Sequence, residues 1–241
     1  GTIDVVDAPE TTTESWWANG SSHARVTDAY PDQPVEVVLA TGGDDDGSDD
    51  VTVERVRLTA THRLTAEFHA RHLAELPADV ADLPRGVRSV RFVELDHTFA
   101  DADVAGGAIG FTVAGQTLDG ADPTRVVLYR YGPAEGWIAL PTELVGWTDD
   151  GVRYRAETPG FSLFAVTVGT PAFSVTDVTL GDRHAVADEP VTVHVTVRND
   201  GTVGGRFTAD LRADSEAVTS GSVVVEPGAS ETLTLEYAFG P

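Results

Sequence analysis

Three of the seven histidines stand close together in the chain and could bind a metal ion. His69 and His72 are three residues apart, and His62 precedes this pair by seven. On a helix, residues three apart share one face, so both rings could reach one transition metal. No third ligand completes a known spacing, and the H-E-x-x-H pattern of zinc enzymes is absent. We therefore expect solvated histidines, with a metal site as the alternative.

The second group that could do chemistry is an acidic run, Asp44–Asp50, interrupted only by Gly47 and Ser48. Carboxylate oxygens are the ligands that calcium prefers. The run lacks the glutamate that closes an EF-hand loop, so a site here would have to be looser. We predict a solvated hairpin tip and no cofactor, with calcium as the alternative.

Sequence patterns of the common catalytic sites are absent. The chain contains no G-x-S-x-G nucleophile elbow and no glycine-rich phosphate-binding loop. It contains no cysteine, which excludes thiolate catalysis and disulfides. Paired carboxylates for glycoside hydrolysis cannot be singled out among 39 acidic residues. We predict that the protein is not an enzyme.

The composition indicates a protein adapted to concentrated salt. The formal charge is −23, from 39 acidic and 16 basic residues, and every basic residue is arginine. Hydrated carboxylates keep a surface soluble where salt screens their repulsion. Arginine retains cationic contacts through a planar, weakly hydrated head. We therefore expect a halophile, most simply a halophilic archaeon.

The same charge limits the partners. Without a basic stripe the chain cannot neutralise phosphates, which argues against nucleic acid, and an anionic membrane surface would repel it. No apolar run approaches the length of a membrane-spanning helix. The chain has no initiator methionine and no leader, so we expect a mature or excised segment of an exported, extracellular protein.

Strand signals dominate the chain and predict a mainly all-β fold of two β-sandwich domains. The single helix-like stretch is Ala66–Leu76, where Phe68, His72 and Leu76 fall on one helical face. We predict a short helix or an irregular crossover there. Strands before residue 170 are expected at Thr2–Val6, Val35–Leu39, Val51–Leu58, Val90–Val93, Ala108–Val113, Arg125–Tyr131, Gly136–Leu140, Val152–Ala156 and Ser162–Val168.

Residues 170–241 predict a second domain of short strands at roughly ten-residue spacing. The alternating strand Pro190–Val197 runs into Asn199-Asp200-Gly201, whose residues tolerate the positive φ of a turn. This pattern resembles the CARDB-type immunoglobulin-like modules of cell-surface proteins. Five strands fall short of a seven-stranded sandwich, so we expect a domain that lacks its last strands. The five are Phe173–Leu180, Pro190–Val197, Arg206–Arg212, Ala217–Val225 and Glu231–Phe239.

The segment from Leu128 to Val166 is the most specific in the chain. It contains Leu-Tyr-Arg-Tyr, then Trp-Ile-Ala-Leu-Pro-Thr, and ends in Thr-Pro-Gly-Phe-Ser-Leu-Phe-Ala-Val. It resembles the PGF-pre-PGF domain of archaeal surface proteins, over about residues 22–168. The resemblance implies a secreted or wall-anchored protein with no known reaction.

A structural role for this motif follows from the residues themselves. Pro159 fixes φ, and Gly160 permits the positive φ of a type II turn, so that Phe161 and Phe164 re-enter the core. The motif's large aromatic residues supply further rigid apolar area. The alternative is that exposed aromatic rings, tryptophans among them, form a platform on which sugars stack. The motif aromatics are Tyr129, Tyr131, Trp137 and Tyr154, and the platform candidates are Trp16, Trp17 and Trp147.

The N-terminal extension, residues 1–21, suggests how copies assemble. Its strand consists of Thr2, Ile3, Asp4, Val5 and Val6, and a polar spacer separates that strand from the first domain. A spare strand at one end and an incomplete sandwich at the other could combine head to tail. Asn19 begins an N-x-S glycosylation sequon.

We therefore expect a cell-surface or filament subunit that binds copies of itself or other surface proteins. An adhesion or glycan-binding module cut from a longer protein is the alternative.

Overall fold

The computed structural model describes residues 10–40, 50–181, 189–213 and 215–238. It divides into two compact units: unit 1 holds residues 1–82 and 89–168, and unit 2 holds residues 83–88 and 169–241. Within the described ranges the helices are three short 3-10 turns, and antiparallel strands make up the rest of the regular structure, which confirms the all-β prediction. The turns are Asp101–Asp103, Gly115–Leu118 and Pro123–Arg125.

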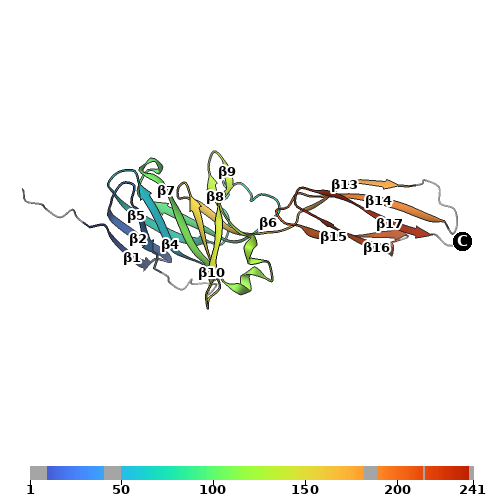
Figure 1. The fold of residues 1–241 in the computed structure, drawn as a ribbon, viewed down its shortest axis with the longest axis horizontal. Helices are drawn as coiled ribbons and strands as arrows, with labels where there is room; N and C mark the ends of the chain where they lie inside the picture. Colours follow the sequence, from blue (N-terminus) through green and yellow to red (C-terminus); the bar gives the residue numbers. More distant parts are fainter. Residues whose placement is uncertain (1–9, 41–49, 182–188, 214, 239–241) are drawn as a thin grey trace, which may run out of the picture. The chain divides into compact units, whose positions relative to one another are not determined.

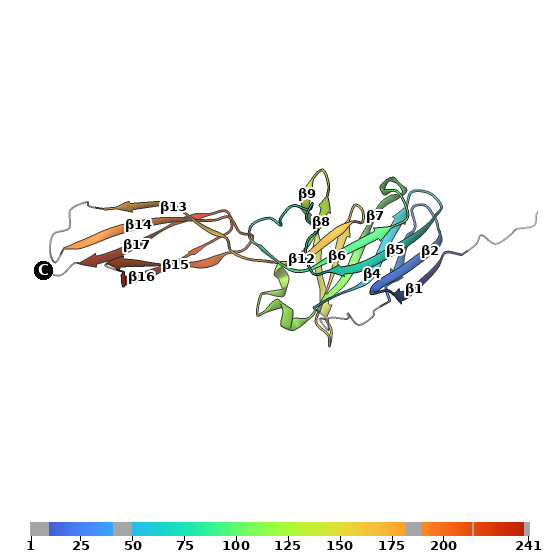
Figure 2. The ribbon, with the colours of Figure 1, turned by 180° about the vertical axis from the view of Figure 1, so that it is seen from behind.

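Unit 1 is a sandwich of two sheets, seen from opposite sides in Figures 1 and 2. Each sheet is antiparallel, with strands that come from distant parts of the chain. The seven-stranded sheet runs in the order β1 (Thr12–Ala18), β2 (Ser21–Ala29), β5 (Leu64–Leu73), β6 (Val87–His97), β12 (Leu163–Gly169), β8 (Val126–Gly132), β9 (Gly136–Ala139). The five-stranded sheet runs β10 (Thr142–Trp147), β11 (Val152–Thr158), β7 (Val104–Val113), β4 (Val51–Ala60), β3 (Pro34–Val38).

Alternating residues of both sheets fill the core of unit 1. Phe68 of β5 packs edge to face against Phe99 and Phe161, and Phe111 of β7 stacks on Tyr154 of β11. Such aromatic pairs stabilise a core beyond the area that they bury. Tyr154, Phe68 and Phe111 are among the largest of the fully buried side chains of the described residues.

Tyr154 gives this core a measurable pH dependence. Its hydroxyl donates to the Pro123 carbonyl oxygen at 2.9 Å. Burial, with a smaller contribution from the Asp122 carboxylate, raises the pKa of Tyr154 to about 12. The folded state therefore holds this proton more tightly than the unfolded chain, whose tyrosine pKa is about 10. The stabilisation is present below pH 10 and is lost as pH rises through 12.

We expect Tyr154→Phe to cost about 1 kcal/mol at neutral pH through the lost hydrogen bond. The variant should also lose less stability than the wild type between pH 10 and pH 12. Urea unfolding at a series of pH values, followed by tryptophan fluorescence, measures both effects. If the free energy of unfolding changed with pH in the same way for both proteins, the pKa of Tyr154 would not differ between the folded and unfolded states.

The helix prediction for Ala66–Leu76 is wrong. This stretch lies within and beyond β5, whose Ala66, Phe68 and Ala70 are buried at a period of two. Apolar residues four apart satisfy both a helical face and one side of a strand. The segment forms a strand because β2 and β6 pair with it on its two sides.

Strand β1 extends unit 1 toward the N-terminus of the chain. It pairs with β2 through Asn19 and Gly20, whose φ values are 53° and 72°. Two successive positive φ values define a type I′ hairpin turn, for which Asn-Gly is the favoured sequence. The structure thus includes Thr12–Ala18 in a sheet that we expected to begin near Ser22. The predicted strand Thr2–Val6 lies outside the described residues.

Unit 2 contains the five strands that the sequence predicted, arranged in two sheets. Alternating apolar residues of β14 and β17 form its small core: Val193, Val195, Leu233 and Leu235. Partly buried side chains of the second sheet, among them Phe207 and Val223, cover that core. The first sheet is β13 (Phe173–Leu180), β14 (Pro190–Asn199) and β17 (Ser230–Ala238), and the second is β15 (Gly205–Ala213) and β16 (Glu216–Val225).

Asn199 joins the elements at one end of unit 2. Its side chain is fully buried. Oδ1 accepts from the backbone nitrogens of Ala172 and Gly201, at 3.0 and 2.9 Å. Nδ2 donates to the carbonyl oxygens of Val203 and Val225, at 2.8 and 2.9 Å.

The predicted positive-φ turn at Asn199-Asp200-Gly201 is wrong, because none of the three residues has a positive φ. The strands on either side of it, β14 and β15, belong to different sheets. Asparagine is required at position 199 because its side-chain amide makes these four hydrogen bonds.

The segment Leu83–Arg88 belongs to unit 2, although in the sequence it follows β5 and includes Val87 and Arg88, the first two residues of β6. We call it the strap. The carbonyl oxygen of Gly86 accepts from the Thr170 nitrogen and the Thr202 hydroxyl, both at 2.7 Å. Gly86 has φ +81°, and a Cβ on it would meet Gly201 Cα and lie 2.8 Å from Thr202 N. Only glycine fits this backbone contact.

Candidate interaction surfaces

One apolar face in unit 2 is left uncovered. Val175, Val178 and Leu180 of β13 stand directly opposite three valines of β14. Opposite residues of antiparallel strands point to the same face. The β14 valines are at most 8% exposed, whereas the β13 residues are 51–58% exposed. The three valines of β14 are Val197, Val195 and Val193.

The contrast arises because the second sheet is narrower than the first. Gly221 of β16 lies against Leu233 and Leu235 of β17, and β15 pairs with β16 on one edge alone. Among the described residues no strand pairs with the other edge of β15. A strand added there would lie next in order, over β13. This position combines unpaired backbone groups with an apolar face, which is what an added strand requires.

The Pro-Gly-Phe segment forms a packed corner in unit 1. Phe161 and Phe164 are 2% and 1% exposed. Thr158 Oγ1 donates to the Gly160 carbonyl oxygen at 2.5 Å, and Ser162 Oγ donates to the Tyr131 carbonyl oxygen at 2.9 Å. The predicted positive φ of Gly160 is wrong. A Cβ at Gly160 would lie 3.4 Å from Arg130 Nη2, an ordinary contact distance, so neither φ nor space requires glycine at this position.

The other aromatics of the motif are also placed by packing. Tyr129 of β8 is buried, and burial raises the pKa of its hydroxyl. Tyr131 lies 5.2 Å from Trp137, centroid to centroid, across the β8–β9 pair. Trp137 Nε1 donates to the Ala81 carbonyl oxygen at 2.7 Å. These contacts fit the structural role of the motif rather than a sugar platform.

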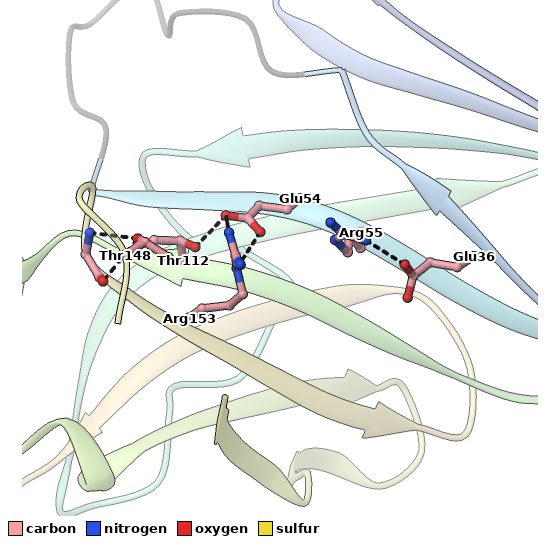
Figure 3. Close-up of polar contacts among 7 residues, drawn as sticks. Glu36, Glu54, Arg55, Thr112, Thr148 and Arg153 are labelled. Carbon is pink, nitrogen blue, oxygen red and sulfur yellow. Dashed lines mark hydrogen bonds and ion pairs between the residues drawn. The ribbon is translucent and has the colours of Figure 1, made fainter. Parts of the chain in front are cut away.

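The outer face of the five-stranded sheet carries four ion pairs, two of which are drawn in Figure 3. Arg153 of β11 donates through Nε to Glu54 Oε2 at 3.0 Å, and Thr112 Oγ1 donates to Glu54 Oε1 at 2.5 Å. Arg55 Nη1 reaches Glu36 at 2.7 Å. Glu54 and Arg55 both face outward because the register of β4 against β7 shifts at this point, as in a β-bulge.

The charged groups on this outer face neutralise one another. Arg57 and Arg155 share Glu157, at 3.0 and 2.6 Å, so each arginine of the face has a glutamate partner. The hollow between these pairs is floored by Ala108 and Gly110 and is open to solvent. Exposed pairs of this kind contribute at most about 1 kcal/mol each. We interpret the face as a solvated, charge-balanced surface.

The tryptophans do not form one platform. Trp16 and Trp17 are 36% and 38% exposed on β1, and Trp147 is 70% exposed on β10. Strand β1 lies at one end of the seven-stranded sheet and packs near β3, whereas β10 lies at the opposite end of the five-stranded sheet from β3. Trp16 and Trp17 point to opposite faces of β1, since they are consecutive in a strand.

The histidine pair of the sequence is split by the strand. His69 faces outward on β5, whereas His72 stands opposite Val93, on the core side. His62 lies 3.8 Å from Asp103 and is separate from both. Among the described residues no three histidine or carboxylate groups are arranged to hold a metal. The topology instead places His23 beside His69, a neighbour that sequence spacing could not reveal.

The remaining candidates concern calcium and glycosylation. Asp44–Asp49 lie outside the described residues, and Asp50 accepts from Thr117 Oγ1 at 2.8 Å and Arg91 Nη2 at 3.1 Å. Asn19 is exposed at the tip of the β1–β2 hairpin.

No family model matches the chain, and no curated protein matches it. The part of the chain that the structure describes contains no helix long and apolar enough to cross a membrane.

Proposed function

We propose that this protein is a non-enzymatic, extracellular structural subunit of a halophilic archaeon, at the cell surface or in a filament. In this proposal copies assemble head to tail, and unit 2 of one copy accepts a β-strand from the next. The observation that carries the proposal is the uncovered face of Val175, Val178 and Leu180 beside the free edge of β15. The halophilic and archaeal parts come from composition and the PGF-pre-PGF resemblance.

The donor in this proposal is the segment Thr2–Val6 of a second copy. Its alternation places Ile3 and Val5 on one side of a strand and Asp4 on the other. Ile3 and Val5 would cover the β13 face, while the donor backbone pairs with β15. Covering side chains that are about half exposed contributes roughly 1 kcal/mol each. Backbone hydrogen bonds along the edge add to this.

The first test compares assembly of three proteins by sedimentation velocity over a range of concentrations. The wild type should form concentration-dependent oligomers, and the double variant Ile3→Asp, Val5→Asp should remain monomeric. Asp4→Thr is the matched control, because this side chain faces away from the acceptor, and it should assemble like the wild type. Equal assembly of all three proteins would overturn strand exchange through this segment.

The second test locates the contact. The chain has no cysteine, so a pair introduced by Val5→Cys and Val178→Cys is the only one available for a disulfide. Cross-linked ladders on a non-reducing gel would support exchange between copies. A disulfide within single chains would show that the strand folds back on its own molecule, and the filament proposal would then be wrong.

A further inference from the structure

Four side chains form a row on the outer face of the seven-stranded sheet. Trp16 of β1 is opposite His23 of β2, His23 is opposite His69 of β5, and His69 is opposite Asp96 of β6. Directly opposite residues share a face, and their Cβ atoms are about 5 Å apart. We call this set the histidine row.

The two imidazoles of the row are close enough to share one ligand. Their ring centroids are 4.5 Å apart, with the planes inclined at 60°. Trp16 stacks on the other side of His23, at 5.4 Å and 10°. His69 is exposed, and neither of its ring nitrogens has a hydrogen-bond partner among the described residues.

A backbone contact fixes the tautomer of His23. Its Nε2 lies 3.3 Å from the Ala18 carbonyl oxygen. A carbonyl oxygen can only accept, so Nε2 carries the hydrogen and the neutral ring keeps its lone pair on Nδ1. Metal-binding histidines commonly use their second nitrogen in this way, donating to a backbone carbonyl.

The charge around the row favours a cation. Arg25 is held between Glu14 and Glu67, and Arg71 pairs with Glu94, so the nearby arginines are occupied. Asp96 has no ion-pair partner within the described ranges. Its carboxylate stands one strand beyond His69 and adds negative charge where a metal would approach.

We propose that His23 and His69 form a two-histidine site for a divalent transition-metal ion of the copper, nickel or zinc type. The two rings supply two nitrogen ligands from adjacent strands, and water fills the remaining positions. Imidazole suits these metals, and affinity follows the order Cu²⁺ above Ni²⁺ and Zn²⁺. The site does not depend on strand exchange in unit 2, because every residue of the row belongs to unit 1.

The test titrates the full chain with CuCl₂ in concentrated KCl with excess Mg²⁺, which occupies carboxylates because it prefers oxygen ligands. Calorimetry should give one saturable site per chain, and Cu²⁺ should quench the fluorescence of the stacked Trp16. Because the second ring binds intramolecularly, His23→Ala and His69→Ala should each weaken binding roughly 100-fold. His72→Ala, on the same strand but the opposite face, is the control and should bind like the wild type.

A further variant separates the reporter from the ligands. Trp16→Phe should keep the calorimetric site and lose most of the quenching. Far-UV circular dichroism checks that each variant folds. Saturable binding that persists unchanged in both His23→Ala and His69→Ala, or that disappears in His72→Ala alone, would overturn the proposal, as would the absence of a saturable site in the wild type.

Discussion

Replacing Asn199 by aspartate is expected to unfold unit 2 while unit 1 stays folded. The substitution removes the amide hydrogens that Val203 and Val225 accept, and it places a carboxylate against those two carbonyl oxygens. The site is fully buried, so water cannot replace the lost partners. We expect a loss of about 3–5 kcal/mol, which exceeds what a core as small as that of unit 2 can absorb.

The two units can be followed separately in this experiment. All four tryptophans, at positions 16, 17, 137 and 147, belong to unit 1. Their fluorescence should therefore keep its wild-type unfolding midpoint, while calorimetry loses the transition of unit 2 and trypsin cleaves within β14–β17. Asp200→Asn is the control, because Asp200 is exposed and bonds to Arg198 and Ser174 at the surface. A stable unit 2 in Asn199→Asp would show that the amide is dispensable.

Substituting Gly86 by alanine is expected to detach the strap from unit 2. The new Cβ would meet Gly201 Cα, and the left-handed φ of +81° adds its own cost. Moving the strap away would also remove the acceptor of Thr170 N and Thr202 Oγ1. We expect unit 2 to lose about 3 kcal/mol or more.

Gly228→Ala separates the two causes. Gly228 also lies in unit 2 and has φ +72°, but nothing stands within 4 Å of its would-be Cβ. Gly228→Ala should lower the stability of unit 2 by only about 1 kcal/mol, which is the cost of the left-handed conformation alone. Calorimetric transition temperatures of the two variants measure the difference. Equal losses would mean that the contact between Gly86 and Gly201 contributes nothing.

Period-two alternation made most of the strands predictable, and unit 2 shows this best. Pro190–Val197 alternates strictly, and the five predicted segments correspond to β13–β17. The failure at Ala66–Leu76 has the same origin, because a spacing of four fits both a strand and a helix. The β1–β2 hairpin was available in the sequence as Asn19-Gly20 between alternating residues, which is a strong turn signal.

The candidate sites depend on register, which sequence spacing does not contain. Val178 and Leu180 look like ordinary strand residues until pairing puts them opposite buried valines with nothing above them. His23 and His69 are 46 positions apart and meet only because β2 pairs with β5. The roles of Asn199 and Gly86 could not be predicted from the sequence either. An asparagine in a turn and an asparagine with a buried, hydrogen-bonded amide look the same in one sequence, and nothing in the sequence shows which backbone packs against Gly86.

The strap also constrains how such a protein can change over generations. Because Leu83–Arg88 belongs to unit 2 and is flanked in the sequence by residues of unit 1, unit 2 is encoded in two pieces. A recombination event that copies only residues after Val168 would transfer a module without the backbone that Thr170 and Thr202 bind. The two units are therefore expected to duplicate and be exchanged together, as a single heritable block.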